Sequence, residues 1–112
     1  MATTYFTLTG VKFNYGDDFM EAGIGVRLVK EPDNEHDSEA IRVEMDGLGK
    51  VGYVANSPHT VQGESLSAGR LYDRIGDKAT GKILYKLAGG VLCTVDEESI
   101  LYTPPTLVES EI

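Results

Sequence analysis

The stretch VKEPDNEHDSEAIRV, residues 29–43, joins a polar turn to the clearest strand pattern in the chain. Five carboxylates fall within residues 31–39, a segment opened by Pro32 and rich in turn-forming residues. From Ile41 to Met45, apolar and charged side chains then alternate, which is typical of a strand with one buried face. The stretch therefore predicts two strands joined by a short, charged connection, and the rest of the fold is interpreted starting from this prediction.

Alternation of apolar and polar residues predicts strands along the rest of the chain as well. Asp46-Gly47-Leu48-Gly49 is rich in turn residues and predicts a hairpin between two of these strands. Further on, we expect Ile83, Tyr85 and Leu87 to face the core together, until Gly89-Gly90 breaks the run. The expected strands lie at residues 4–9, 24–28, 41–45, 51–54, 83–87, 91–95 and 100–102.

One helix is predicted. An apolar stripe runs from Ala68 to Ile75 with the i, i+3, i+4 and i+7 spacing of a helix face. Ser65 is expected to cap its start and Gly76 its end. Several short strands around one short helix predict a mainly β protein, in the form of a small OB-like β-barrel.

The length of 112 residues suits one domain with one hydrophobic core. We expect a single domain over residues 1–103 and an acidic tail over residues 104–112, because Pro104-Pro105 stops the last strand.

Cys93 stands in an apolar run, so we expect a core side chain rather than a nucleophile. The first residues lack a signal-peptide pattern, and no apolar segment approaches the ~18 residues of a membrane span. These features predict a cytoplasmic protein with no membrane partner.

The net charge of −8 argues against general affinity for nucleic acid, which depends on Lys and Arg side chains that neutralise phosphates. The charge is unevenly distributed, however. Residues 31–46 hold seven acidic groups and one basic group, whereas residues 47–90 hold six basic and three acidic groups. A local basic surface on an acidic protein is therefore compatible with the sequence, and a broad one is not.

The acidic loop can be interpreted in three ways. A calcium loop of the helix–loop–helix kind needs glycine where Ser38 stands, and the flanking segments have strand patterns. A zinc site needs three or four convergent ligands, whereas the sequence offers His36, His59, Cys93 and carboxylates. Asn and Asp side chains also bond nearby backbone N–H groups, which would make the loop a structural turn. We expect no cofactor and no catalytic function, and the choice between a structural turn and a ligand-binding loop stays open at this point.

Four segments carry a resemblance to a known family. They are residues 10–16 (GVKFNYG), 26–37 (VRLVKEPDNEHD), 40–43 (AIRV) and 51–54 (VGYV). In order and spacing they resemble the HIRAN domain family, in which a hydrophobic strand precedes Glu-Pro-x-Asn-x-x-Asp, Ala-Ile-x-Val and Gly-Tyr-Val. The resemblance covers roughly residues 4–87 and is weak in the C-terminal third.

The resemblance implies an OB-like barrel that binds DNA and captures the 3′ end of a single strand. At the matching positions, Asp37 would accept a hydrogen bond from the terminal 3′-hydroxyl and Asn34 would contact a base or sugar. The backbone around His36 would complete the pocket. These roles are chemically reasonable, because a hydroxyl group needs an acceptor such as a carboxylate.

The resemblance also implies a basic and aromatic loop at residues 12–14. Lys12 matches a position that contacts phosphate, and Phe13 matches an aromatic on which a base stacks. Asn14 stands where the family has a second aromatic, and Tyr53 stands where it has a histidine beside the phosphate. Stacking of a base on an aromatic ring contributes ~1–3 kcal/mol.

Two departures from the family pattern keep an alternative open. The chain has only one of the two stacking aromatics, although Tyr15 lies nearby, and Glu31, Asp33, Glu35 and Glu39 surround the expected pocket. Carboxylates within a Debye length of ~8 Å weaken phosphate binding at physiological salt. The leading prediction is a non-enzymatic module that binds single-stranded DNA 3′ ends. The alternative is a protein-interaction or regulatory domain that has lost DNA binding, and the family's association with hydrolases and zinc gives a third, weaker hypothesis.

Overall fold

The computed structural model describes residues 3–14 and 16–101, apart from the side chain of Phe13. Tyr15, the predicted strand end at Tyr102 and the predicted tail at residues 104–112 lie outside the described residues. Nine elements follow one another along the described chain. They are β1 (Thr4–Thr9), η1 (Val11–Phe13), β2 (Gly25–Lys30), β3 (Ile41–Met45), β4 (Gly49–Val54), α1 (Ala68–Tyr72), β5 (Lys78–Leu87), β6 (Gly90–Val95) and η2 (Glu97–Ser99).

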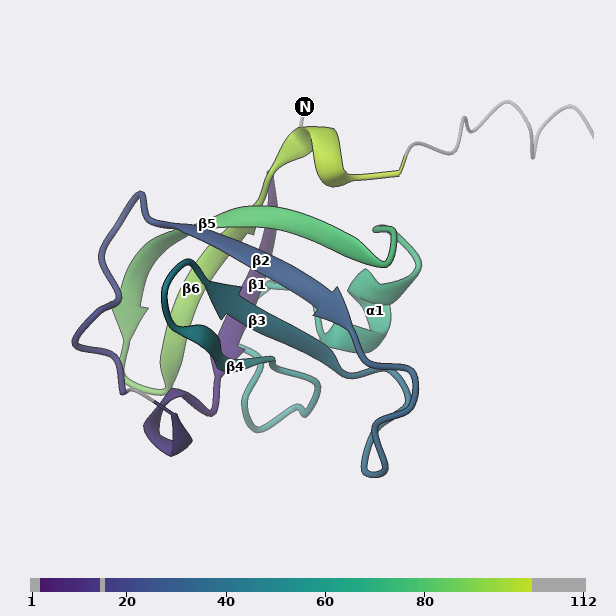
Figure 1. Ribbon diagram of the computed structural model, residues 1–112, viewed down its shortest axis with the longest axis horizontal. Coiled ribbons are helices and arrows are strands. Elements are labelled where there is room, and N and C mark those ends of the chain that lie inside the picture. The colour runs from purple at the N-terminus through teal and green to yellow at the C-terminus, as the bar shows by residue number, and fades with distance from the viewer. Residues whose placement is uncertain (1–2, 15, 102–112) are drawn as a thin grey trace, which may run out of the picture.

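The strands form a closed antiparallel barrel in the order β1-β4-β3-β2-β5-β6 (Figure 1). β1 pairs with β6 from Thr4 to Leu8, but it pairs with β4 only at Leu8 and Thr9. β1 therefore closes the barrel through two seams of paired residues, a long one with β6 and a short one with β4. The prediction of a mainly β fold, with a small barrel and one short helix, is confirmed.

The interior of the barrel is built by strict alternation along most strands. On β3, Ile41, Val43 and Met45 are buried, whereas Arg42 and Glu44 lie on the outside. Removal of apolar surface from water contributes roughly 25 cal/mol per Å², so this interior is the main source of stability. The largest fully buried apolar side chains are those of Phe6, Leu8, Met20, Leu28, Ile41, Leu71, Ile75, Ile83, Val43, Val51 and Val91.

Cys93 is one of the core side chains. It lies on β6 and is fully buried. Burial raises the pKa of its thiol to about 12, so the group is protonated at neutral pH. The predicted role of Cys93 as a core residue is confirmed.

The second half of β5 departs from the predicted pattern. The register between β5 and β6 shifts between Ile83 and Tyr85, which marks a bulge. One extra residue reverses the faces that follow it, so Ile83 is buried whereas Tyr85 is 54% exposed. The prediction that both residues face the core was wrong, because a period of two residues does not reveal a bulge.

α1 lies at one end of the barrel and is shorter than the predicted helix (Figure 1). Ser67 caps it in place of Ser65, since the Ser67 hydroxyl accepts a backbone N–H of the first turn. Ser65 is buried instead, and its hydroxyl lies 2.8 Å from the hydroxyl of Thr7. The helix ends at Tyr72, so the predicted end at Gly76 was wrong as well. In the described part of the chain, no helix is long and apolar enough to cross a membrane.

The last predicted strand, at residues 100–102, is not formed by the residues that the structure describes. After β6 the chain makes the short helix η2, and Ile100 forms one isolated bridge with Ile75. The N–H of Leu101 donates to the carbonyl oxygen of Arg74 at 2.8 Å. Because β1 and β6 already close the barrel, no free edge is left for a further strand.

Candidate nucleic-acid interface

The loop between β2 and β3 holds its shape through its own side chains. Asn34 Oδ1 accepts the backbone N–H groups of His36 and Asp37, at 2.9 and 3.1 Å. Asp37 Oδ1 accepts the N–H of Glu39 at 2.9 Å. These are the Asx turns expected of a structural turn. Asn34 and Asp37 therefore stabilise the loop.

Glu31, at the start of this loop, accepts three side-chain hydrogen bonds. Asn34 Nδ2 and the Tyr53 hydroxyl donate to its Oε1 at 2.9 and 3.0 Å. The Arg42 guanidinium donates to its Oε2 at 2.8 Å. Burial acts to raise the pKa of Glu31, but these three hydrogen bonds and the guanidinium charge outweigh it and lower the pKa. Burial, reinforced by the bond to Glu31, raises the pKa of Tyr53.

The Glu31 hydrogen bonds predict a loss of stability in acid. The pKa of Glu31 in the folded protein lies below its ordinary value of 4.5, so the unfolded chain binds this proton more readily. The stabilisation is therefore complete above about pH 4.5 and is lost as the pH falls through the folded-state pKa. Glu31→Gln should reduce this acid dependence and cost about 1–3 kcal/mol of unfolding free energy at neutral pH, because Arg42 loses one of its two carboxylate partners.

Denaturant unfolding across the acid range measures both effects. Glu35→Gln is the matched control, since Glu35 is an exposed carboxylate of the same loop. If Glu31→Gln and Glu35→Gln show the same stability and the same acid dependence, this account of Glu31 is wrong.

Asn56, which the sequence analysis missed, fixes the second oxygen of Asp37. Its Nδ2 donates to Asp37 Oδ2 at 2.8 Å, and its Oδ1 accepts the N–H of Gly69 in α1 at 2.8 Å. Asp37 is thereby connected to the helix, and the plane of its carboxylate is fixed. A single Asn after a strand looks like an ordinary turn residue, so only its position just after the Gly-Tyr-Val strand could have indicated a role.

These residues border a cavity of about 440 Å³, which we call the loop cavity. The lining brings together four of the seven residues predicted from the sequence, namely Asn34, His36, Asp37 and Tyr53. His36 is exposed, and the other three are half-buried. The remaining lining residues are Ala40, Val54, Asn56 and Ser57. The predicted end-binding residues thus surround one space, although they come from two separate segments of the chain.

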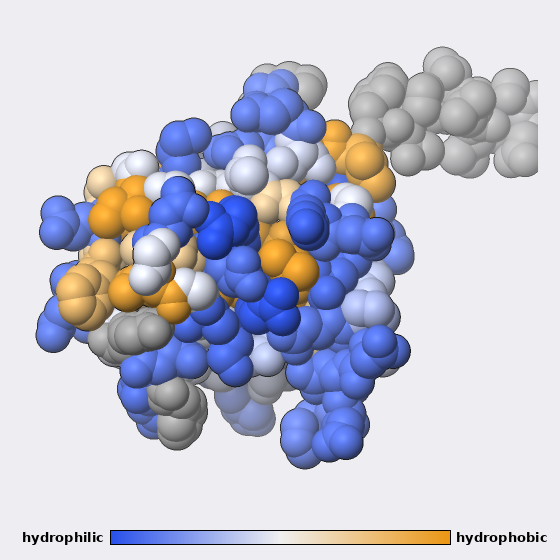
Figure 2. Space-filling view, viewed as in Figure 1, coloured by the Kyte–Doolittle hydropathy of each residue, from blue (hydrophilic) through white to orange (hydrophobic). Residues whose placement is uncertain are grey.

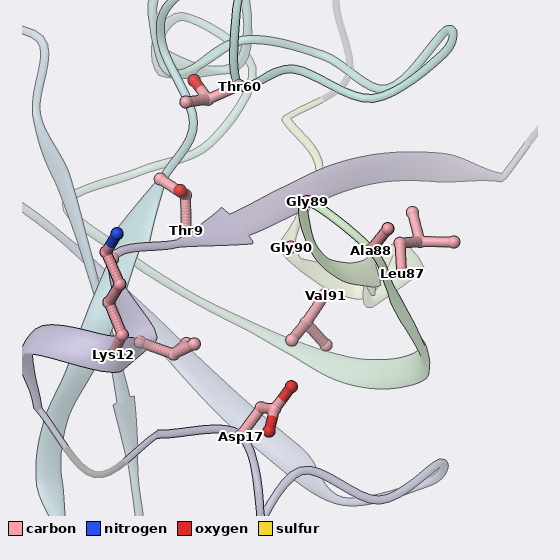
Figure 3. Close-up of a pocket in the computed structure, with 11 residues that line it drawn as sticks. Thr9, Lys12, Asp17, Thr60, Leu87, Ala88, Gly89, Gly90 and Val91 are labelled. Carbon is pink, nitrogen blue, oxygen red and sulfur yellow. The ribbon is translucent and has the colours of Figure 1, made fainter.

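Lys12 borders a second cavity of about 660 Å³, which we call the hairpin cavity. It lies between η1 and the turn that joins β5 to β6 (Figure 3). Lys12 and Asp17 are its charged lining residues, and Thr9 and Thr60 contribute hydroxyl groups. The rest of the lining is apolar or glycine, from Gly10, Val11, Leu87, Ala88, Gly89, Gly90 and Val91.

The η1 turn positions Lys12 at this cavity. Gly10, just before the turn, has a φ of +78°, a conformation that glycine adopts without steric cost. Asn14 closes the turn: its N–H donates to Val11 O at 3.0 Å and its Nδ2 to Gly10 O at 3.1 Å. Asn14 lines neither cavity. The side chain of Phe13 lies outside the described residues, so its stacking role stays a prediction.

The two cavities are neighbours across the short seam between β1 and β4. Thr9 of the hairpin cavity pairs with Tyr53 of the loop cavity. Side chains directly opposite each other in an antiparallel pair share a face and lie roughly 4.5–5.5 Å apart. The cavities are also linked by the Thr60 N–H, which donates to Ser57 O at 2.9 Å. A ligand made of two or more linked groups, such as a dinucleotide, can therefore contact both cavities.

The charges around the loop cavity are partly neutralised within the fold. The lobe that carries the β2–β3 loop is predominantly hydrophilic (lower right in Figure 2). Arg42 pairs with Glu31 at 2.8 Å and with Glu44 at 2.7 Å. The ammonium of Lys50 lies 5.2 Å from the centre of the Tyr53 ring, which places a cation beside the cavity.

Within residues 3–14 and 16–101, no three His, Cys, Asp or Glu side chains converge in a way that could hold a metal ion.

A closed barrel whose loops border two adjoining cavities belongs to the class of small β-barrel binding domains. The family model of the HIRAN domain matches residues 1–60, more than half of the chain, and the protein therefore belongs to the HIRAN domain family. HIRAN domains are non-catalytic DNA-binding modules, and the matched region contains all seven predicted interface residues. No curated protein and no solved structure matches the chain.

Proposed function

We propose that this chain binds single-stranded DNA and recognises its 3′ end in the loop cavity. The observation that supports the proposal best is that Asn34, His36 and Asp37 share one cavity with Tyr53. Membership in the HIRAN family supplies the DNA-binding class. The domain proposed to carry this activity is residues 1–103, followed by an acidic tail at residues 104–112.

Asp37 is the proposed acceptor for the terminal 3′-hydroxyl. An ionised carboxylate can accept about four hydrogen bonds. Within the chain, Glu39 and Asn56 each donate one hydrogen bond, to different oxygens of Asp37. Acceptor capacity therefore remains for a hydroxyl donor in the cavity. A terminal phosphate carries about −1.5 to −2 charge and would be repelled by the same carboxylate.

The remaining roles follow the chemistry of the two cavities. Lys12 at the hairpin cavity and Lys50 beside Tyr53 are the cations proposed to hold backbone phosphates. Asn34 is proposed to contact the terminal base or sugar, and the backbone at His36 to complete the pocket. In this proposal Tyr53 lies beside the phosphate and Asn14 maintains the shape of the basic loop.

Fluorescence anisotropy with short, 5′-labelled single strands tests the proposal. At low salt, strands with a 3′-hydroxyl should bind about 10- to 100-fold more tightly than the same strands with a 3′-phosphate, the effect of one hydrogen bond to a charged acceptor. Equal and negligible binding of both kinds of strand would overturn the proposal.

Phe13→Ala should weaken binding of both kinds of strand alike. Loss of one base–aromatic contact costs about 1–3 kcal/mol, and stacking does not depend on the terminal group. Phe19→Ala is the matched control, because Phe19 is 53% exposed and lines neither cavity. The same anisotropy titrations decide the point: equal affinities for Phe13→Ala and Phe19→Ala would contradict a stacking role.

A second candidate function is a protein-interaction domain. The observation that favours it is a groove beside Tyr5 and Tyr85, which are 39% and 54% exposed, with Leu84, Leu87 and Leu92 in its lining. Pull-downs with and without nuclease separate the two functions. A partner that disappears on nuclease treatment counts against direct protein binding.

A further inference from the structure

Asp17 is a charged side chain of the hairpin cavity to which the family resemblance gives no role. Gly16 precedes it, with a φ of +72°, and the Gly16 N–H donates to Val11 O at 2.8 Å. This contact folds the chain back beside η1 and positions Asp17 at the cavity. Figure 3 shows the Asp17 carboxylate directed into the space between Lys12 and the hairpin turn.

The carboxylate of Asp17 differs from those around the loop cavity. The carboxylates of Glu31 and Asp37 each accept at least one hydrogen bond from another side chain. Within the described residues, no hydrogen bond or ion pair involves the Asp17 carboxylate, and only its backbone oxygen is used, by the N–H of Met20 at 3.0 Å. Its acceptor capacity is therefore directed at the cavity and open to a ligand.

The walls of the hairpin cavity suit a flat ring. Gly89 and Gly90 contribute backbone to one wall, and a Cβ at Gly90 would meet Thr7 at 2.9 Å, so this wall stays free of side chains. Val11, Leu87 and Val91 add apolar surface. The volume of about 660 Å³ lies within the roughly 300–1,000 Å³ of typical ligand pockets.

We infer that the hairpin cavity accommodates the base next to the 3′-terminal nucleotide, and that Asp17 selects bases with an exocyclic amino group. An ionised carboxylate only accepts hydrogen bonds, so it pairs with the amino groups of cytosine, adenine and guanine. Thymine carries no exocyclic amino group, and its O4 carbonyl oxygen, at the position of the cytosine amino group, repels a carboxylate. The hydroxyls of Thr9 and Thr60 can donate or accept, so they do not discriminate.

The inference rests on the proposed function, because the terminal nucleotide must occupy the loop cavity. Pairing of Thr9 with Tyr53 puts the two cavities side by side. Lys12 lines the hairpin cavity, where a cation can hold the phosphate of the second nucleotide while its base contacts Asp17.

The test uses the full chain and short single strands that differ only in the base before the 3′-terminal nucleotide. Anisotropy should show about tenfold tighter binding for cytosine, adenine or guanine than for thymine at this position. Pyrimidin-2-one, which is cytosine without its amino group, should bind as weakly as thymine. This comparison needs no protein variant.

Asp17→Asn should reduce the preference to less than about twofold, because an amide can donate to thymine as well as accept. Asp18→Asn is the matched control, since it removes the same charge from an exposed neighbour that does not line the cavity. The control should keep the full preference. A preference that survives in Asp17→Asn, or one that Asp18→Asn also abolishes, overturns the assignment.

Measurements on the same strands distinguish this inference from the proposed function. If the wild type discriminates 3′-hydroxyl from 3′-phosphate ends but binds all penultimate bases equally, only the role of Asp17 is refuted. If it binds none of the strands, the proposed function fails and the inference fails with it.

Discussion

Asp37→Asn should remove most of the discrimination between 3′-hydroxyl and 3′-phosphate ends while the protein stays folded. The amide keeps an oxygen for the Glu39 N–H, so this turn is retained, whereas the hydrogen bond from Asn56 is lost because an NH2 group replaces its acceptor. It cannot keep the charge that favours a hydroxyl donor and repels a phosphate. The ratio of the two affinities should therefore fall by about 10- to 100-fold, as expected for one hydrogen bond to a charged acceptor.

Asp33→Asn is the control for this experiment, because it removes the same charge from an exposed position of the same loop. It should raise the affinity for both ends slightly and leave their ratio unchanged. Asp37→Ala removes the turn contacts as well, and thermal unfolding should show a cost of about 0.5–2 kcal/mol. An Asp37→Asn protein that discriminates as well as wild type would refute the assignment of Asp37.

Gly52→Ala should destabilise the barrel more than any other single-methyl change near the site. A Cβ at position 52 would lie against the carbonyl oxygen of Thr9 and 2.8 Å from Leu8 Cδ1. The Thr9 oxygen belongs to the backbone, and Leu8 is fully buried, so neither can move without cost. We expect a loss of about 1–3 kcal/mol or more, which lowers Tm by over about 5 °C.

Gly25→Ala provides the comparison within the same barrel. A Cβ at Gly25 would meet Gly81 O at 3.8 Å, an ordinary van der Waals contact. Thermal unfolding of the two variants should therefore give a large difference in Tm. Similar Tm values would show that the β1–β4 seam is packed less tightly than the structure describes. The link between the two cavities, which depends on this seam, would then be in doubt as well.

Much of the barrel could be predicted because side-chain alternation records which face of a strand is buried. On β3 this signal comes from Ile41, Val43 and Met45, and the turn residues Asp46-Gly47 predict the hairpin between β3 and β4. The signal fails where the backbone adds a residue, as at the bulge before Tyr85. It also fails at the chain end, where Ile100 resembles a strand residue but finds no free edge.

The candidate site was predictable where it depends on local turn chemistry and on the family motif. Asn34 and Asp37 cap the loop as their residue types suggest. Asn56 and Asp17 could not be found in this way, because their roles depend on which distant segments the closed barrel brings together. The caps of α1 were misassigned for the same reason, since burial of Ser65 against Thr7 is a tertiary contact.

The neutralisation of carboxylates within the fold changes the expected effect of the acidic loop. Glu31 and Glu44 share Arg42, so they contribute less negative potential than their number suggests. Asp33 and Glu35 stay exposed, and their repulsion of phosphate is reduced as salt is raised. Binding by this chain should therefore fall less steeply with salt than binding by a basic module.

A competition between linear and circular single-stranded DNA of the same sequence tests end recognition most directly. The circle has the same bases and phosphates as the linear strand but no 3′ end. If the loop cavity binds the terminus, the linear strand should displace a labelled 3′-hydroxyl strand from the protein at least about tenfold better than the circle. Equal competition by the circle would contradict the claim that this HIRAN domain recognises a 3′ end.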